Sequence, residues 1–400
     1  LGELMNWKRI DQLDLKGKRV LTRVDINVPI KDSIVSDTTR IERIIPTITS
    51  IVANGGIPII ISHFGRPTKQ KEKEYSLKQL VPYLSKYLEQ EVIFTDQDEI
   101  NTIVKQSKAL KPGQILLLEN IRFRSGETSN DPILAQQLAE LGEVFCNDAF
   151  SAAHRAHAST EGIAHLLPNC VGFQMEAELL NLEQTLITPK QPVTAIIGGS
   201  KISTKINLLN NLAQKFNFLV IGGGMANTFL KAAGFNIGKS LYEEDYLNSA
   251  IKISKIAEQS NCKIVLPNDI VVAKELIDKS SFEIYDVTKC PNDLMILDIG
   301  PQTIKKVCNV IKESKTLIWN GPLGAFEFQP FNNSTDEIAK FSSKLTSEGK
   351  LVSVAGGGDT ISALSSTGSD KEFTYISTAG GAFLEWMEGK ELPAIKPLLD

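Results

Sequence analysis

The sequence predicts an α/β protein of two lobes, each with a parallel β-sheet flanked by helices. Its 400 residues exceed what a single hydrophobic core usually serves, which favours two domains of ordinary size. Short β-branched runs alternate with longer amphipathic stretches, and this rhythm is typical of repeated strand–helix units. A content of 42% hydrophobic and 22% charged residues is that of a folded globular protein rather than a fibrous or disordered one.

The strands and helices follow from the spacing of the apolar residues. Predicted strands are Arg19–Val24, Ile57–Ile61, Ile115–Leu118, Val144–Cys146, Val193–Ile197, Phe218–Ile221, Lys263–Leu266, Met295–Leu297, Thr316–Trp319 and Leu351–Val354. Predicted helices include Arg40–Ala53, Leu77–Glu89, Ile206–Phe216 and Ile338–Leu345. The segment 174–188 is rich in Glu and Leu and ends before Pro189, so we expect a connecting helix there. The expected domains are a first lobe over residues 1–173, the connecting helix over 174–189 and a second lobe over 190–378.

The composition argues against several classes of protein. A net charge of −4 gives no reason to expect nucleic acid or an anionic membrane as a partner. The longest apolar runs are the length of strands, and the first residues show no secretory signal, so we expect a cytoplasmic protein without a membrane span. The five cysteines are scattered without the spacing of metal ligands, which favours reduced thiols over disulfides or zinc.

Arginine and glycine are distributed unequally between the two halves. All nine arginines precede position 156 and all four histidines precede position 166, although lysine is the commoner cation. Arginine offers phosphate or carboxylate a rigid, bidentate fork that lysine lacks. Four of the five glycine clusters lie in the second half, mostly between a predicted strand and a helix, where backbone N–H groups can bind phosphate. The first half therefore suits a small anion and the second half a polyphosphate.

In the first half, polar residues follow the predicted strands, at the edge where open α/β sheets bind ligands. The candidates are Asp25 and Asn27 in RVDINVP, Arg40 at the next helix start, His63 and Arg66 in SHFGRP, Arg122 in LENIRF and Arg155 in AHRAH. We expect the arginines at neighbouring strand ends to converge on one crevice. Two alternatives stay open: the first pair could form an Asx turn, and the helical arginine could be an exposed surface residue.

In the second half, three motifs combine glycine with charged or polar residues. The candidates are Gly198, Gly199, Lys201 and Lys205 in IGGSKISTK, Asn320 and Glu327 in WNGPLGAFEF, and Gly356, Gly357, Gly358, Asp359 and Thr360 in AGGGDT. The i, i+4 spacing of the two lysines predicts ammonium groups on one helix face. Asp359 is a candidate Mg²⁺ ligand and Glu327 a candidate partner of a ribose hydroxyl. The alternatives are a solvated lysine face, a helix N-cap and an ordinary strand-end turn.

Taken together, RVDINVP, SHFGRP, LENIRF, AHRAH, IGGSK, WNGPLGAFEF and AGGGDT, in this order and at these separations, resemble the phosphoglycerate kinase family from about Trp7 to the C-terminus. The resemblance implies two Rossmann-like lobes joined by a hinge helix, with residues 379–400 returning toward the first lobe. It also implies reversible transfer of the acyl phosphate of 1,3-bisphosphoglycerate to Mg-ADP, giving 3-phosphoglycerate and ATP, by a cytoplasmic monomer of glycolysis or its reverse. The lobes would close around the two ligands during this transfer.

The resemblance further assigns roles to individual residues. It places phosphoglycerate on Asp25, Asn27, Arg40, His63, Arg66, Arg122 and Arg155. It places the nucleotide on Gly198, Gly199, Lys201, Lys205, Gly300, Asn320, Glu327, Gly356, Gly357, Gly358, Asp359 and Thr360, with Mg²⁺ on Asp359. We expect Arg40, Lys201 and Lys205 to stabilise the transferring group, because phosphoryl transfer needs positive charge and alignment rather than a nucleophile.

Three positions depart from the family's usual pattern. Where the family commonly reads TGGGAS, this chain reads TAGGAF, so Ala379 replaces a glycine and Phe383 replaces a small hydroxyl residue. Thr204 stands where the family often has an acid. We expect these changes to affect turnover rather than identity.

Two rival functions make different demands on the sequence. A nucleotide-dependent dehydrogenase needs a complete GxGxxG fingerprint, but Asn227 stands where the third glycine should follow Gly222 and Gly224. The P-loop-like segment 234–240 has too few residues between its glycines. A two-lobed anion-binding protein without catalysis needs the arginines but neither Asp359 nor Lys205, and it remains the alternative.

Overall fold

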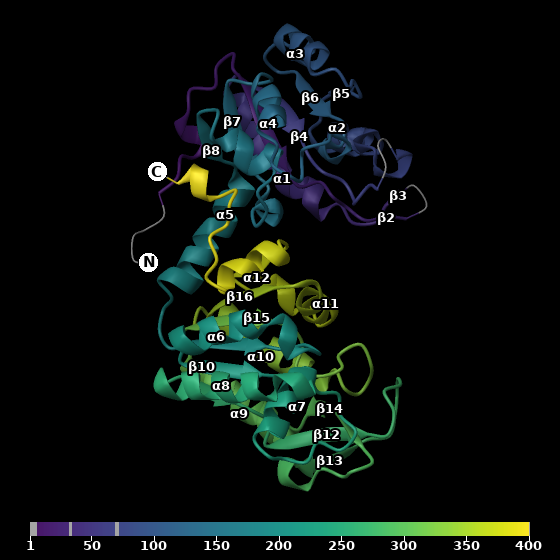
Figure 1. Ribbon diagram of the computed structural model, residues 1–400, viewed down its shortest axis with the longest axis vertical. Coiled ribbons are helices and arrows are strands. Elements are labelled where there is room, and N and C mark those ends of the chain that lie inside the picture. Colours follow the sequence, from purple (N-terminus) through teal and green to yellow (C-terminus); the bar gives the residue numbers. More distant parts are fainter. Residues whose placement is uncertain (1–5, 32–33, 69–71, 400) are drawn as a thin grey trace. The chain divides into compact units, whose positions relative to one another are not determined.

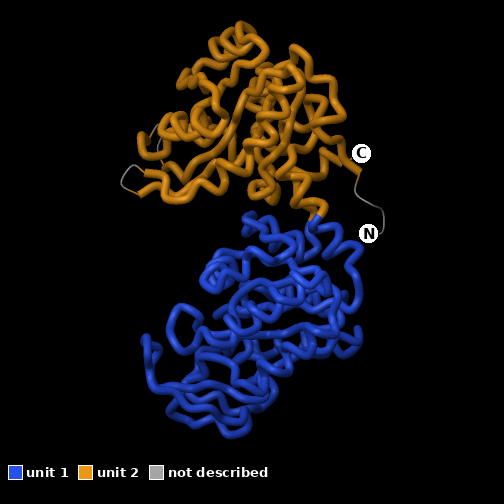
Figure 2. Tube along the Cα trace, turned by 180° about the vertical axis from the view of Figure 1, so that it is seen from behind, with its two compact units in different colours: residues 1, 181–390 blue, residues 2–180, 391–400 orange. Residues whose placement is uncertain are grey.

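The computed structural model describes residues 6–31, 34–68 and 72–399 (Figure 1). The chain divides into two compact units (Figure 2), which we call the N-terminal lobe, residues up to 180 together with those from 391, and the C-terminal lobe, residues 181–390. The first division lies within the expected connecting segment 174–189. The second division follows Lys390, which is later in the chain than the expected position 379. The reason is that α12 (Gly381–Met387) packs against α6 (Ile206–Lys215) of the C-terminal lobe. In this contact, Asn211 Nδ2 donates to the Met387 carbonyl at 2.5 Å.

A six-stranded sheet, parallel throughout, forms the centre of the N-terminal lobe. Its strands in spatial order are β5 (Val92–Thr95), β6 (Ile115–Leu118), β4 (Ile57–Ile61), β1 (Arg19–Val24), β7 (Val144–Asp148) and β8 (Asn169–Val171). Strands β2 (Ile30–Lys31) and β3 (Ile34–Val35) pair with each other in antiparallel fashion. The helices are α1 (Thr39–Ala53), α2 (Val81–Tyr87), α3 (Ile100–Ala109) and α4 (Pro132–Ala139).

Helix α1 shows how the apolar period produces the packing in this lobe. Ile41, Ile44, Ile48 and Ile51 recur at helical spacing, and all four are buried. The predicted helix Leu77–Glu89 is split, since a 3-10 turn covers Leu77–Leu80 before α2 begins. Pro82 in the first turn of α2 explains the break, because proline has no N–H to continue a preceding helix.

The C-terminal lobe contains a second six-stranded parallel sheet and a smaller antiparallel one. The strands of the parallel sheet in spatial order are β11 (Lys263–Val265), β10 (Phe218–Ile221), β9 (Val193–Ile197), β15 (Thr316–Asn320), β16 (Val352–Gly356) and β17 (Tyr375–Ser377). The antiparallel sheet is formed by β13 (Glu283–Asp286), β12 (Asp269–Ala273) and β14 (Met295–Ile299), so the predicted strand Met295–Leu297 does not belong to a parallel sheet.

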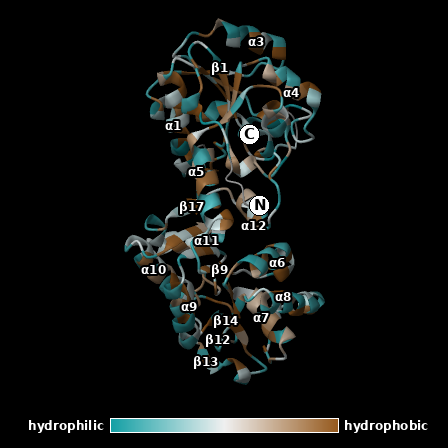
Figure 3. Cartoon of the chain, turned by 90° about the vertical axis from the view of Figure 1, so that its left-hand side faces the viewer, coloured by the Kyte–Doolittle hydropathy of each residue, from teal (hydrophilic) through white to brown (hydrophobic). Residues whose placement is uncertain are grey.

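Helices flank this parallel sheet as well. Besides α6 and α12 they are α7 (Gly223–Ala232), α8 (Leu247–Gln259), α9 (Pro301–Glu313), α10 (Asn333–Ser347) and α11 (Gly358–Ser366). The core beneath them includes Trp319, which is fully buried and donates its indole N–H to the Gly321 carbonyl at 2.8 Å. Figure 3 shows the hydrophobic strands between helices that also carry hydrophilic residues. Within the described ranges, no helix has both the length and the apolar character that a membrane span requires.

Two segments connect distant parts of the chain. Helix α5 (Phe173–Leu182) crosses the division between the units and continues as a π-helical turn to Ile187. The last described residues pack on the N-terminal lobe, where Ala394 N–H donates to the Ala153 carbonyl at 3.1 Å and Asn169 Nδ2 donates to the Pro397 carbonyl at 3.0 Å.

Candidate functional site

The polar residues after β1, β4, β6 and β7 meet at the carboxyl edge of the N-terminal sheet. These four strands are parallel neighbours, so their carboxyl ends lie at the same edge. His63 follows β4 and lies within electrostatic range of Arg40 and Arg122. Arg122 in turn lies within range of Arg66 and Arg155. We call this set the arginine cluster: Arg40, His63, Arg66, Arg122 and Arg155.

Asp25 and Asn27 hold the first part of the arginine cluster in place. Arg40 Nη1 donates to Asp25 Oδ2 at 2.9 Å and to the Asn27 carbonyl at 3.1 Å. Asn27 N–H donates to Asp25 Oδ1 at 3.0 Å, which is the Asx turn considered from the sequence. Asn27 Oδ1 accepts from Gly65 N–H at 2.9 Å. The turn and the contact with Arg40 therefore coexist, and Arg40 is a partly buried residue of the cluster rather than an exposed helical arginine.

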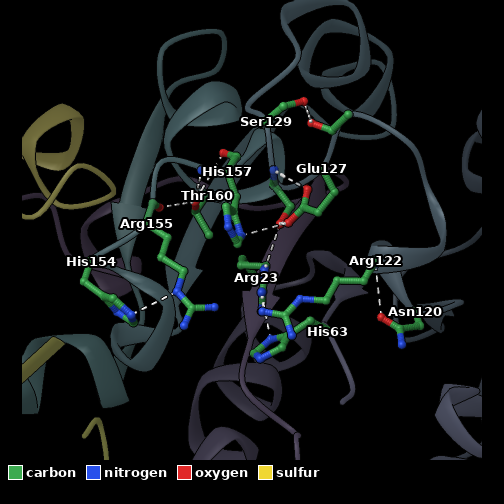
Figure 4. A network of polar contacts seen from close by, with 12 residues as sticks. Arg23, His63, Asn120, Arg122, Glu127, Ser129, His154, Arg155, His157 and Thr160 are labelled. Atoms are coloured by element: carbon green, nitrogen blue, oxygen red, sulfur yellow. Dashed lines mark hydrogen bonds and ion pairs between the residues drawn. The ribbon is translucent and has the colours of Figure 1, made fainter. Parts of the chain in front are cut away.

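The cations of the cluster crowd one another. Burial first, and then the charges of Arg155, Arg23 and Arg66, lower the pKa of Arg122 to about 10. Arg122 also donates through Nη1 to the Gly65 carbonyl. Figure 4 shows its guanidinium beside His63 and Arg23, with Arg155 directed to the same region. Cations held this close are stabilised by an anion among them, so the geometry favours binding of a phosphate or carboxylate group.

Arg23 and Glu127 belong to this region, although the sequence did not single them out. Arg23 is 1% exposed at the carboxyl end of β1, and Glu127 is 1% exposed after the predicted LENIRF motif. Burial lowers the pKa of Arg23. Because arginine is rarely buried, an arginine within an apolar strand could have been recognised from the sequence as a candidate functional residue. Glu127 gave no comparable local signal.

A glycine-lined cavity of about 320 Å³ opens beside the parallel sheet of the C-terminal lobe. Its lining includes Gly199, Glu327 and Asp359, three of the residues predicted for the nucleotide. Its other lining residues include Gly223, Gly224, Leu241, Leu276, Leu323 and Phe326. Apolar side chains and glycine backbone in one cavity suit a ligand with a flat ring and a charged tail.

Two glycines in this lobe are required by close backbone contacts or by backbone conformation. A Cβ added at Gly198 would lie 1.8 Å from the Pro322 carbonyl oxygen. Gly357, the N-cap of α11, has φ +97°, a conformation that residues with side chains rarely adopt. The turns after β9 and β16 therefore depend on glycine.

Lys205 and Asn320 link these turns. The Lys205 ammonium donates to the Gly198 carbonyl at 2.8 Å and to Asn320 Oδ1 at 2.5 Å. Asn320 Nδ2 donates to the Gly356 carbonyl at 2.7 Å, and Gly321 N–H donates to Thr360 Oγ1 at 2.6 Å. Burial lowers the pKa of Lys205 to about 8, against the opposing charge of Asp359.

The expectation that Lys201 and Lys205 share one helix face was wrong. A 3-10 turn covers Ile202–Thr204, and α6 begins only at Ile206. Lys201 precedes the turn with extended backbone and is exposed, whereas Lys205 is drawn inward by its contacts with Gly198 and Asn320.

Gly300 lies outside the residues that line the cavity. It is the N-cap of α9, and a Cβ there would lie 2.4 Å from the carboxyl group of Asp269. That carboxylate accepts from Gln302 N–H at 2.9 Å and Thr303 N–H at 2.8 Å, so the glycine makes room for the group that caps the helix.

Asp359 is the described carboxylate best placed for a metal ion near the glycine turns. It is exposed in the first turn of α11 and lines the cavity. Among the residues that the structure describes, no group of three or more His, Cys, Asp and Glu side chains could hold a metal by itself. Mg²⁺ commonly takes one or two carboxylates and completes its shell with phosphate oxygens and water, so a single aspartate fits it.

Comparison with known proteins decides the family. The phosphoglycerate kinase family model matches residues 10–390. The chain belongs to the phosphoglycerate kinase family. Its members are phosphotransferases of glycolysis, and so is this protein. The phosphoglycerate kinase of Ruegeria pomeroyi is 54% identical over 395 residues, which cover 99% of each chain.

Solved structures of phosphoglycerate kinases share the fold. The phosphoglycerate kinase of Coxiella burnetii superposes with a TM-score of 0.92 at 40% identity, covering 98% of this chain and 99% of that one. The enzyme of Pyrococcus horikoshii gives a TM-score of 0.79 at 28% identity, covering 98% of each chain. The predicted fold of two lobes, each with a parallel sheet flanked by helices, is confirmed.

The structure shows the surroundings of the three residues that depart from the usual phosphoglycerate kinase pattern, which are Phe383, Ala379 and Thr204. Phe383 is 1% exposed in α12, and its ring fills the space beside Gly356, where an added Cβ would lie 2.5 Å away. Ala379 is buried before the same helix. Thr204 is exposed and donates to the Lys201 carbonyl at 2.9 Å. Phe383 therefore packs against the glycine turn after β16.

Proposed function

We propose that the arginine cluster binds 3-phosphoglycerate or 1,3-bisphosphoglycerate and that the glycine-lined cavity binds ADP or ATP, for reversible transfer of the acyl phosphate to ADP. The observation that carries the proposal is the convergence of strand-end cations on His63 and Arg122 in one lobe. The other lobe supplies glycine turns beside a cavity, which suit a polyphosphate.

In the arginine cluster, each guanidinium can donate two parallel hydrogen bonds to a carboxylate or phosphate. Arg66, Arg122 and Arg155 would bind the anionic ends of the substrate, while Asp25 and Asn27 orient Arg40 and bind substrate hydroxyls. Arg40 would then stabilise the charge that develops on the transferring phosphoryl group.

In the C-terminal lobe, the apolar walls of the cavity would take the adenine ring, and Glu327 would accept from a ribose hydroxyl. The turns after β9 and β16 would donate backbone N–H groups, such as those of Gly199, Gly357 and Gly358, to the phosphates, together with Lys201 and Lys205. The N–H of Gly198 is not among these donors, because it donates to the Asn320 carbonyl at 2.9 Å. Thr360 and Asn320 would hold those turns in shape. Asp359 would hold Mg²⁺, which neutralises phosphate charge when it is bound.

We further propose that the enzyme works in the cytoplasm as a monomer. Its five cysteines are all free thiols and four of them are buried, which is typical of proteins from a reducing compartment. The monomeric state is what the family resemblance implies.

The experiment couples ATP, Mg²⁺ and 3-phosphoglycerate turnover to NADH oxidation. We expect turnover by the wild type and a KM for 3-phosphoglycerate raised about 10-fold or more in Arg122→Gln, with the KM for ATP unchanged. Arg124→Gln is the matched control, because Arg124 follows by two residues but donates to the Gln97 and Asp98 carbonyls. Binding of 3-phosphoglycerate without turnover would instead support an anion-binding protein.

A further inference from the structure

A chain of buried polar contacts lies beneath the arginine cluster. Arg23 Nε donates to Ser159 Oγ at 3.0 Å, and Ser159 Oγ donates to Glu127 Oε1 at 2.6 Å. At its other end, the Arg23 guanidinium meets the His63 ring, with Nη2 3.1 Å from Nδ1. Figure 4 shows this chain running from Glu127 through Arg23 to His63. No role assigned so far uses Arg23, Ser159 or Glu127.

The chain pairs two opposite charges that are both removed from water. Arg23 and Glu127 are each 1% exposed, and Ser159 between them is fully buried. Buried ions are tolerated when they are paired and hydrogen-bonded. Glu127 satisfies this condition, since Ser159 N–H donates to its Oε2 at 3.0 Å and His157 Nδ1 lies 3.6 Å from its Oε1. The arrangement therefore fixes the direction in which the Arg23 guanidinium points.

A fixed Arg23 determines the protonation of His63. Arginine has donors and no acceptor, so Nδ1 of the imidazole must accept the bond from Nη2. A neutral ring that accepts at Nδ1 carries its proton on Nε2. Burial, followed by the charge of Arg23, lowers the pKa of His63 well below its usual value, and Arg122 and Arg40 act in the same direction against Asp25. The imidazole is therefore neutral at physiological pH.

We propose that Arg23, Ser159 and Glu127 are positioning residues that hold His63 as a neutral imidazole whose Nε2–H donates to an oxygen of the bound anionic substrate. The inference rests on the proposed function of the arginine cluster. A neutral donor adds a hydrogen bond without adding another charge to cations that already crowd one another. The opposite tautomer would present a lone pair at Nε2, which repels a phosphate or carboxylate oxygen.

Nitrogen NMR of protein labelled with ¹⁵N-histidine tests the tautomer directly. The chain has four histidines, and the spectrum of His63→Gln identifies the signals of His63. We expect Nδ1 without a proton and Nε2 with one, unchanged between about pH 6 and 8. A protonated Nδ1, or a ring that titrates in this range, would overturn the proposal whatever the activity. Loss of turnover with the expected spectrum would count only against the proposed function.

Ser159→Ala tests the positioning role, because it removes the hydroxyl between Glu127 and Arg23 while keeping both charges. We expect mixed His63 tautomers and a KM for 3-phosphoglycerate raised about 3- to 10-fold, with the KM for ATP unchanged. Ser107→Ala is the matched control: Ser107 is also fully buried in this lobe, and its Oγ accepts from Arg19 Nη1 at 3.0 Å. We expect this variant to keep the wild-type spectrum and both KM values.

Glu127→Gln gives a second test if the serine variant does not fold, since the amide keeps the shape of the carboxylate and removes its charge. The same mixed tautomers and the same selective rise in KM would support the proposal. A wild-type His63 spectrum in both variants, or equal changes in the two KM values, would overturn it.

Discussion

The two proposed anion-binding sites, one in each lobe, are built in different ways. In the N-terminal lobe the site is formed by side chains: Arg40 and Arg122 are held by hydrogen bonds to Asp25 and to the Gly65 carbonyl. In the C-terminal lobe the backbone has the larger share, at turns that exist because Gly198 and Gly357 lack side chains. The N-terminal site should therefore be most sensitive to the loss of a functional group, and the C-terminal site to the gain of a methyl group.

The largest effect is expected for Arg40→Lys. A lysine ammonium cannot reproduce a guanidinium that contacts Asp25 and, in the function we propose, the transferring phosphoryl group as well, so we expect kcat to fall about 100-fold with the fold intact. Steady-state kinetics and circular dichroism measure the two quantities. Arg43→Lys, one turn later in α1, is the control and should keep its activity. An unchanged kcat in Arg40→Lys would remove Arg40 from the transition state.

Gly356→Ala tests whether the C-terminal lobe is sensitive to an added methyl group. Its Cβ would lie 2.5 Å from the Phe383 ring, so we expect Gly356→Ala to lower the free energy of unfolding by about 2 kcal/mol. Gly358 has open space around the corresponding position, and Gly358→Ala should leave the stability unchanged or slightly raised. Denaturant unfolding compares the two variants, and equal stabilities would show that the turn has room to adjust.

Asp359→Asn removes a charge from the side of the C-terminal cavity. We expect the Kd for the Mg-nucleotide to rise about 10-fold, because the amide is a poorer Mg²⁺ ligand than the carboxylate. Calorimetric titration with and without Mg²⁺ measures the change. Asp336→Asn, in the first turn of α10, changes a similarly placed acid that is not among the lining residues of the cavity and serves as the control. The same Mg²⁺ dependence as in the wild type would exclude Asp359 as the ligand.

The smallest effect concerns the charge of Lys205. Burial lowers its pKa to about 8, and the cation is the form that attracts phosphate. Activity should therefore be kept below this pH and lost above it, with kcat/KM for the nucleotide falling to about half near pH 8. In Lys205→Arg the charge persists, so this fall should be absent even if the rate is lower overall. A fall of the same size in both proteins would assign it to another group.

The fold was predictable where local pattern and final environment agree. The predicted strands Arg19–Val24, Ile57–Ile61 and Ile115–Leu118 have the same bounds in the structure, because continuous apolar runs suit strands buried on both faces. Met295–Leu297 looks the same locally, but its pairing with β12 makes it antiparallel. The apolar pattern of residues 295–297 does not reveal which strand pairs with them or in which direction.

The residues of the candidate sites were likewise predictable only where the local sequence carried the information. The arginines of the cluster could be named from residue type and from their place after predicted strands. Glu127 could not, because its link to Arg23 passes through Ser159, which lies 136 residues from that arginine in the sequence. The lysine pair was misplaced for a related reason: α6 begins only after Lys205, and the side chain of Lys205 is directed by contacts with Gly198 and Asn320, which the i, i+4 spacing does not reveal.

The return of the chain end to the N-terminal lobe affects how the protein is made. Asn147 and Asn169 donate to the carbonyls of Ala394 and Pro397, so the N-terminal lobe includes residues that the ribosome adds after the whole C-terminal lobe. The lobe whose synthesis begins first is therefore completed after the other, and these contacts cannot form until residues 181–390 have been made.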